Sequence, residues 1–146
     1  MPELPEVETT RRGIEPHVLG QTVAAVLVRQ EKLRWPVSAD LGQGLTGQRI
    51  MAVNRRGKYI LLVTATGRVM IHLGMSGSLR IVDSAAVVRP HDHVDFVLAN
   101  DKVLRFHDPR RFGSIFWLAG ADNHELIDSL GPEPLTLAFS APYLFA

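Results

Sequence analysis

The chain has no cysteine, almost no net charge and few aromatic residues. Without cysteine it can form neither a disulfide framework nor a thiolate metal site. Its 16 Lys and Arg nearly balance 15 Asp and Glu, so any recognition of phosphate must come from local clusters. No apolar run approaches the roughly 18–20 residues that cross a bilayer, and no signal peptide is evident. These absences are consistent with a protein of the reducing cytosol that does not enter membranes.

Short aliphatic segments dominate what is present. With 146 residues, 46% of them apolar, the chain is expected to form one domain with a substantial core. Turn signals such as Ala-Thr-Gly separate the aliphatic segments, and this pattern predicts strands. The predicted strands cover residues 22–30, 48–56, 58–65, 68–74, 77–83, 93–100, 102–108 and 113–119. Eight short strands indicate a mainly β fold, either an antiparallel sandwich or a barrel.

Helices are predicted on both sides of the strand region. Pro5 suits the first helical position, and Val7, Thr10 and Ile14 form a stripe at helical spacing. This helix is expected to end between residues 13 and 19. A second helix is predicted over residues 122–130, where Gly131 would end it.

The chain changes character after the second predicted helix. Pro132 and Pro134 indicate a stiff exit, and the last residues, LTLAFSAPYLFA, end on apolar side chains. Such an ending is typical of an element whose partners lie elsewhere. We therefore predict a domain over 1–133 and, over 134–146, a linker and the start of a further domain. On this interpretation the chain is a fragment.

The opening residues Met1-Pro2-Glu3 could carry covalent chemistry. Removal of Met1 would leave Pro2 with a secondary amine, and α-amino groups titrate near pH ~7.7–8. The neutral fraction of such an amine can attack an electrophilic carbon and form an iminium. Glu3 could move protons beside it. The dipeptide alone favours a simpler interpretation, because a Pro-Glu pair is common at the start of a helix.

Two loops present cations beside an apolar side chain. In DPRRFG (108–113), Arg110 and Phe112 have the chemistry needed to enter a base stack, unless Phe112 is buried. In HLGMSGSLR (72–80), Met75 is either an exposed wedge or core filler. The two loops together favour a nucleic-acid partner.

Two further motifs leave their function open. In RRGKYI (55–60), Lys58 follows Gly57, a pattern that suits either phosphate binding or a plain hairpin turn. In PHDHVDF (90–96), His91 and His93 lie two apart on one predicted strand face, and Asp95 would complete a metal site. The absence of a third imidazole at matching spacing favours hydrogen-bonded partners or phosphate contacts instead.

Taken in order, MPELPEVETTRRG, RRGKYI, HLGMSGSLR, HDHVDF, DPRRFG and LGPEPL resemble the bacterial formamidopyrimidine-DNA glycosylases over nearly the whole chain. The resemblance implies a catalytic N-terminal domain, a two-layer antiparallel β-sandwich of about eight strands flanked by an N-terminal and a C-terminal helix. The family continues with a helix–two-turns–helix domain, which would be truncated here, and a four-cysteine zinc finger, which would be absent. No cofactor or metal is therefore expected in this chain.

The resemblance also implies an activity, base excision repair of oxidised purines such as 8-oxoguanine and formamidopyrimidines in double-stranded DNA. Pro2 would attack C1′ of the damaged nucleotide and form a Schiff base, and β- and δ-elimination would follow. Glu3 would be the general acid and base, and Lys58 a proton donor for elimination. A monomeric, cytoplasmic protein near the bacterial nucleoid is expected.

The same resemblance implies DNA contacts. Met75, Arg110 and Phe112 would fill the gap left by the flipped nucleotide, with Arg110 facing the orphaned cytosine. His72 and His91 would hold the DNA backbone, while Glu6 would support the pocket.

Two alternatives stay open. The first is an enzyme of the endonuclease VIII branch, which acts on oxidised pyrimidines and shares the Pro-Glu start. The MSGSL and DPRRFG loops favour the purine branch over it. The second is a catalytically silent fragment that folds and at most binds DNA weakly.

Overall fold

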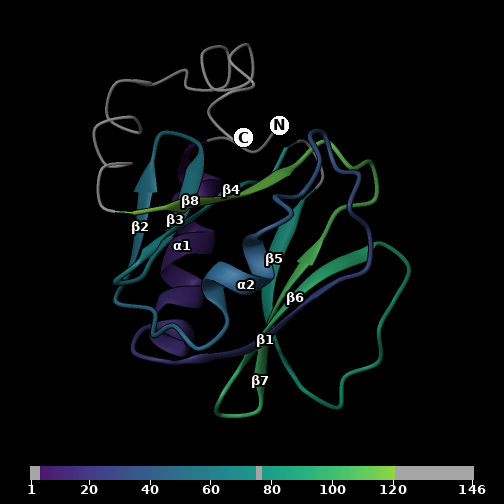
Figure 1. The fold of residues 1–146 in the computed structure, drawn as a ribbon. Helices are drawn as coiled ribbons and strands as arrows, with labels where there is room; N and C mark the ends of the chain where they lie inside the picture. The colour runs from purple at the N-terminus through teal and green to yellow at the C-terminus, as the bar shows by residue number, and fades with distance from the viewer. Residues whose placement is uncertain (1–3, 75–76, 121–146) are drawn as a thin grey trace.

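Two antiparallel sheets of four strands each pack face to face in the protein (Figure 1). The structure is a computed structural model that describes residues 4–74 and 77–120. The elements in chain order are α1 (Leu4–Val18), β1 (Val23–Val28), α2 (Leu41–Leu45), β2 (Ala52–Arg56), β3 (Tyr59–Val63), β4 (Gly67–His72), β5 (Ser78–Asp83), β6 (Asp92–Leu98), β7 (Lys102–His107) and β8 (Ser114–Ala119). The predicted mainly β, two-layer sandwich is confirmed, and each of the eight predicted strands has a counterpart. The barrel is excluded.

The strand order is β1-β6-β7-β5 in the first sheet and β2-β3-β4-β8 in the second. The main core lies between them, because alternate side chains of each strand face inward. Ile60 and Ile71 from the second sheet and Phe96 and Phe106 from the first are fully buried there. A second apolar cluster, which includes Met70, occupies the other face of the second sheet.

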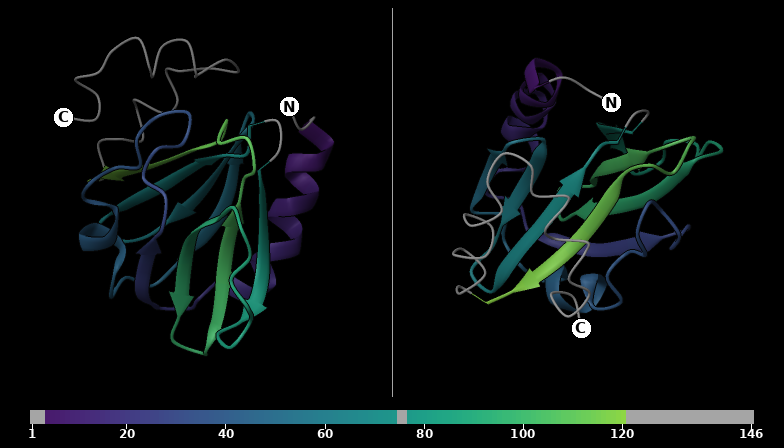
Figure 2. Two further views of the ribbon diagram at one scale, coloured as in Figure 1. Left: turned by 90° about the vertical axis from the view of Figure 1, so that its right-hand side faces the viewer. Right: turned by 90° about the horizontal axis from the view of Figure 1, so that it is seen from above.

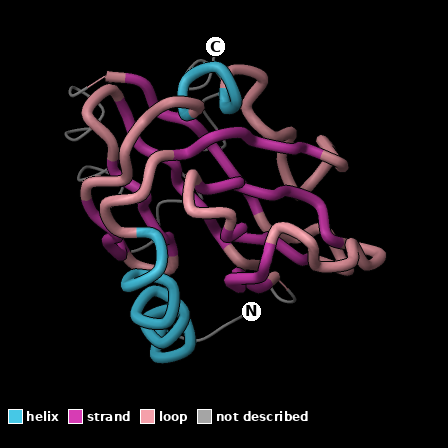
Figure 3. The backbone as a smooth tube through the Cα atoms, turned by 90° about the horizontal axis from the view of Figure 1, so that it is seen from below, coloured by secondary structure: helices cyan, strands magenta, loops and turns pink. Residues whose placement is uncertain are grey.

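The two helices close opposite sides of the sandwich (Figures 2 and 3). α1 packs on β2, β3 and β5, whereas α2 packs on β1, β4 and β8. The apolar stripe of α1 is buried through Val7 and Ile14, and the helix ends at Val18, within the predicted interval. At the contact of α1 with β2, Glu8 accepts hydrogen bonds from Arg11 and from Arg55 on β2. These bonds, together with that from Arg12, lower the pKa of Glu8 to about 2.

The short helix α2 was not predicted. Its sequence, LGQGL, contains two glycines, which disfavour a helix interior. Packing explains it, because Leu41 and Leu45 are buried in the main core. A Cβ at Gly44 would lie 2.3 Å from the indole of Trp117, so no larger residue fits there without displacing the ring.

A register shift in β6 puts acidic residues on the outer face of the first sheet. Asp92 pairs with His107 and Val94 with Phe106, so one extra residue is accommodated between them. Asp92 and Asp95 thereby both face outward, while Val94 points into the core. These positions on the outer face are nonetheless buried: Asp92 and Asp95 are each only 2% exposed.

Ion pairs explain the burial of Asp95. Arg105 donates to both of its oxygens, at 2.9 and 3.0 Å, and Arg29 donates to one of them at 2.7 Å. Burial alone would raise the pKa of Asp95, but the hydrogen bonds from Arg105 and Arg29 outweigh it and lower the pKa.

The predicted helix over 122–130, the domain boundary near 133 and the linker over 134–146 lie outside the described residues and stay predictions. Among the residues that are described, no helix has both the length and the apolar character needed to span a bilayer.

Candidate active site and nucleic-acid interface

Lys58 lies at the tip of the hairpin between β2 and β3. Arg56 pairs with Tyr59, which leaves Gly57 and Lys58 as a two-residue turn. Gly57 has φ 59°, the positive value that a type II′ turn needs at its first central position. RRGKYI therefore forms a hairpin turn, and the binding of phosphate by this turn stays a prediction. The turn holds the half-buried Lys58 at the end of β3.

His72 ends β4 directly across from this hairpin. It pairs with Tyr59, and the centres of the two rings are 5.0 Å apart. Its ring is 5% exposed, and burial together with the charge of Lys58 lowers the pKa of His72 to about 4. His72 is therefore neutral at pH 7. Because its Nδ1 accepts the Gly74 N–H at 3.0 Å, the ring proton resides on Nε2, which is left as a donor.

The 108–113 loop follows β7 and presents a stacked cation and aromatic ring. Phe112 is 41% exposed, so the alternative in which it is buried is wrong. The guanidinium carbon of Arg110 lies 5.6 Å from the centre of the Phe112 ring. Arg111 adopts φ 57°, an uncommon value for a residue with a side chain, and this turns the loop back toward β8.

The 72–74 turn and the 108–113 loop touch backbone to backbone. A Cβ at Gly74 would lie 2.5 Å from the carbonyl carbon of Phe112. A Cβ at Gly113 would lie 2.7 Å from the carbonyl oxygen of His72. Glycine at both positions thus brings the segment of His72 and the segment of Phe112 into direct contact.

His91 and His93 differ in setting. His91 is exposed and precedes β6 with φ 73°, so the prediction that both histidines share one strand face is wrong. The rings still lie 5.9 Å apart. His93 is buried, which lowers its pKa, and its Nε2 is 2.8 Å from the carbonyl oxygen of Asp108. The interpretation of His93 as a hydrogen-bonded residue is confirmed.

Metal ligation has no support in the geometry. Within residues 4–74 and 77–120, no group of three His, Asp or Glu side chains is arranged to hold an ion. Asp95, the third ligand considered for the histidine pair, is instead engaged by Arg29 and Arg105. Because the sequence has no cysteine, the four-cysteine site of the family cannot be formed by this chain.

A continuous set of contacts thus joins the described site residues. Lys58 adjoins the partner of His72, the turn after His72 touches Phe112, and the loop of Phe112 begins at a residue bonded to His91. Pro2, Glu3 and Met75 lie outside the described residues, although α1 begins directly after Glu3. Glu6 is exposed in the first turn of α1. The roles of all these residues stay predictions.

Two hydroxyl groups in the row of His72 were not anticipated. Tyr59, His72 and Ser114 are paired across β3, β4 and β8. The hydroxyls of Tyr59 and Ser114 are buried and have no hydrogen-bond partner in the described part of the chain, and burial raises the pKa of Tyr59. Nothing in a strand pattern distinguishes such residues from ordinary core positions.

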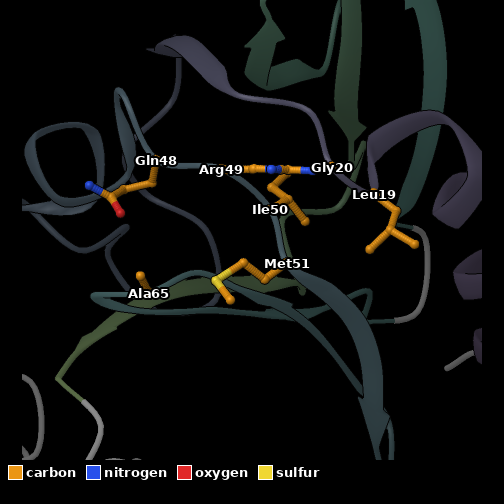
Figure 4. A pocket seen from close by; sticks show the side chains of 7 residues that line it. All are labelled: Leu19, Gly20, Gln48, Arg49, Ile50, Met51 and Ala65. Atoms are coloured by element: carbon orange, nitrogen blue, oxygen red, sulfur yellow. The ribbon is translucent and has the colours of Figure 1, made fainter.

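A surface pocket of about 530 Å³ lies apart from these residues (Figure 4). It is formed by the segment after α1, the segment just before β2 and the β3–β4 turn, and its lining includes Leu19, Arg49 and Met51. None of the predicted site residues lines it. Its exposed apolar side chains, Leu19 and Met51, do not by themselves indicate a ligand.

Comparison with known proteins supplies the context for this site. Residues 1–115 match the family described as formamidopyrimidine-DNA glycosylase, N-terminal domain. The chain is 56% identical to the formamidopyrimidine-DNA glycosylase of Stenotrophomonas maltophilia strain R551-3 over 146 residues, which is 100% of the chain and 54% of that protein. It is 55% identical to that of Marinobacter nauticus over 145 residues, or 99% of the chain and 54% of that protein.

Solved structures of similar fold point to the same family. The Lactococcus lactis Fpg bound to an abasic site containing DNA superposes with a TM-score of 0.80 at 31% identity, covering 88% of this chain and 47% of that one. The same protein in a complex with a THF-DNA and an inhibitor has a TM-score of 0.80 at 32% identity, with 88% and 48% covered. The chain spans about half the length of the curated relatives it matches. By sequence and by fold, it belongs to the formamidopyrimidine-DNA glycosylase family.

Proposed function

We propose that this chain is the catalytic half of a DNA glycosylase and lyase that excises oxidised purines from duplex DNA. The observation that carries the proposal is the contiguous group of Lys58, His72, His91, Arg110 and Phe112 in a chain of this family. It combines cations for phosphates, a neutral N–H donor and an exposed aromatic ring. These are the groups that an enzyme needs to hold a strand while one nucleotide is turned out of the stack.

The proposed chemistry begins at Pro2. After removal of Met1, its nitrogen forms a bond to C1′ as the bond from C1′ to the purine breaks, and the departing base takes a proton. Opening of the sugar ring gives an iminium, which acidifies the C2′ proton. Loss of that proton expels the 3′ phosphate, and a second elimination expels the 5′ phosphate. Glu3 and Lys58 would move the protons, as the family resemblance implies.

The neutral state of His72 supports a specific role for it. A neutral imidazole whose Nδ1 is occupied offers only its Nε2–H, so it would donate one hydrogen bond to a phosphate oxygen. The charge at this position would then come from Lys58. Arg110 and Phe112 would enter the duplex as one stacked unit.

Borohydride trapping tests the proposal. The chain with Met1 removed is mixed with a duplex containing 8-oxoguanine opposite cytosine, and the reductant should give a covalent adduct whose yield falls strongly in Pro2→Gly. Mass spectrometry of the N-terminus establishes beforehand that the amine is free. Excision that persists in Glu3→Gln would contradict the role given to Glu3.

A fusion of the chain to the C-terminal half of the Stenotrophomonas relative separates the alternatives. If only the fusion traps, the chain is silent by itself but has competent catalytic residues. If neither form traps although the fusion binds the duplex, the proposal is wrong. A duplex with an oxidised pyrimidine tests the endonuclease VIII alternative, which predicts faster cleavage of that substrate than of 8-oxoguanine. The Lactococcus lactis Fpg has been solved with DNA of both the Fapy-dG and the oxidised-pyrimidine type, so both are appropriate probes.

We further propose that the protein acts as a monomer in the bacterial cytoplasm. The bacterial origin of its relatives and the location of chromosomal DNA support the cytoplasmic location, whereas the monomeric state is what the family resemblance implies.

A further inference from the structure

Asp108 is a buried acidic residue that the proposed chemistry does not use. It lies between β7 and the loop that carries Arg110 and Phe112, and its side chain is 0% exposed. One carboxylate oxygen accepts the Arg111 N–H at 3.1 Å, and the other accepts the Gly113 N–H at 2.8 Å. A buried carboxylate is costly unless it is hydrogen-bonded, so the carboxylate and the loop backbone stabilise each other in this conformation.

The main chain of Asp108 ties the same loop to the segment of His91. Its N–H donates to the carbonyl oxygen of His91 at 3.0 Å. Its carbonyl oxygen is 2.8 Å from Nε2 of the buried His93. Asp108, the first residue of the loop, is thus fixed to the start of β6 through both its backbone N–H and its backbone carbonyl oxygen.

The other end of the loop is held against the turn that follows His72. Gly113 donates its N–H to the second carboxylate oxygen of Asp108, and it lies so close to the His72 carbonyl that no Cβ fits. Its own carbonyl oxygen accepts the N–H of Arg34 at 3.0 Å. Gly74 leaves equally little room beside Phe112. Because the backbones are in contact, a displaced loop would push on the segment of His72.

We infer that Asp108 is a positioning residue that sets Arg110 and Phe112 against His72 and His91 before DNA binds. The inference rests on the proposed function, since it concerns groups assigned there to strand holding and base extrusion. A loop fixed in advance enters the duplex without first losing conformational freedom, whereas a loose one must be ordered at that moment. Asp108 itself touches no reacting atom in this role.

The substitution Asp108→Asn tests the inference with little change of shape. An amide has one acceptor oxygen, so only one of the two side-chain bonds to the loop is kept. The Arg111 N–H also donates to the carbonyl oxygen of Asp108 at 3.2 Å and retains that acceptor in either case. Cleavage is measured on two substrates. The first is a duplex with 8-oxoguanine opposite cytosine, which requires extrusion of the base. The second is a single strand with an abasic site, which has no base to extrude and no partner strand to enter.

We expect Asp108→Asn to slow cleavage of the duplex by about a hundredfold, the loss typical of misplaced groups, and to slow cleavage of the single strand much less. The control is Asp101→Asn in the exposed turn between β6 and β7, which should alter neither rate. All variants are made in the form that traps on the lesion duplex, either the chain itself or its fusion.

A second comparison separates positioning from a general loss of structure. When Arg110 and Phe112 are both replaced by Ala, Asp108→Asn should add little further loss on the duplex, because the groups that it positions are gone. If Asp108→Asn does not fold, Gly74→Ala disturbs the same contact from the other segment, and the same selective loss is expected.

Equal losses on both substrates, or a full additional loss in the double-alanine background, would overturn the positioning role. An unchanged duplex rate in Asp108→Asn would also overturn it. Failure of the unsubstituted protein to trap on either substrate would instead count against the proposed function.

Discussion

The buried imidazole of His72 should make the protein less stable in mild acid. Its pKa falls from 6.5 to about 4 on folding, because burial and the nearby charge of Lys58 both disfavour the protonated ring. The unfolded chain therefore binds more protons between these values. The contribution of His72 to stability is complete above pH ~6.5 and is lost as the pH falls toward about 4.

The size of the effect follows from the two pKa values. At about 1.4 kcal/mol per pH unit, the full loss is about 3 kcal/mol, and about 2 kcal/mol of it is already lost at pH ~5. That is a large share of the roughly 5–15 kcal/mol that stabilise a typical domain. Asp95 contributes little in this range, because its pKa is lowered and its stabilisation is lost only below pH ~4.

The assay is urea unfolding followed by tryptophan fluorescence from pH ~7.5 to ~5, a range that spans the ordinary imidazole pKa. The reference is His72→Asn, whose side-chain oxygen can replace Nδ1 as the acceptor for Gly74 but does not titrate. The difference in free energy of unfolding between the protein and this variant should fall by about 2 kcal/mol across the range. Subtraction removes the contribution of His93, whose pKa is also lowered by burial.

Two outcomes would refute the reasoning. One is a difference that stays constant across the range, and the other is an imidazole that titrates by NMR near its ordinary pKa of 6.5. Lys58→Gln provides a graded check. It should raise the pKa of His72 yet leave it below 6.5, because burial is the larger cause.

Further predictions concern packing, the buried ion pairs and the exposed loop. Arg105→Met should destabilise the fold by about 3–5 kcal/mol in urea unfolding, because it leaves Asp95 buried with a single cation, and adding Asp95→Leu should restore much of the loss. Gly67→Ala should cost about 1–3 kcal/mol, since its Cβ would lie 2.6 Å from a backbone oxygen, whereas Gly13→Ala, in open space on α1, should stabilise by about 0.5–1 kcal/mol. Thermal melts that rank the two glycine variants in the opposite order would contradict this. Phe112→Ala should change stability by less than about 0.5 kcal/mol but weaken binding to an abasic duplex by about 1–3 kcal/mol, as measured by fluorescence anisotropy.

Local patterns were sufficient to predict the strands. Val94 and Phe96 alternate with less apolar neighbours, and such alternation specifies one buried face whatever the partner strand is. The start of α1 next to Pro5 and its stripe through Val7 and Ile14 are equally local. By contrast, α2 contains two glycines and exists because its leucines reach the core, which no local propensity reports.

The site was predictable only in part, for a similar reason. The composition of the 108–113 loop indicated that it could present Arg110 and Phe112, but only the structure decided between an exposed and a buried Phe112. The burial and neutrality of His72 depend on its pairing with Tyr59, and the bonds of Asp108 depend on a backbone with left-handed Arg111. Pairing and loop conformation are tertiary properties, so the residue types alone could not indicate them.

The register shift at the start of β6 has a consequence for how this protein can vary. Asp92 and Val94 are two residues apart yet face opposite sides, because their partners His107 and Phe106 are adjacent and His93 is accommodated as an extra residue between them. Deletion of His93 would restore regular alternation and keep both orientations, but it would remove the buried ring whose Nε2 lies 2.8 Å from the carbonyl oxygen of Asp108. Viable length variants among its relatives should therefore avoid this stretch, and an alignment of many such sequences should show a gap-free column at the position of His93.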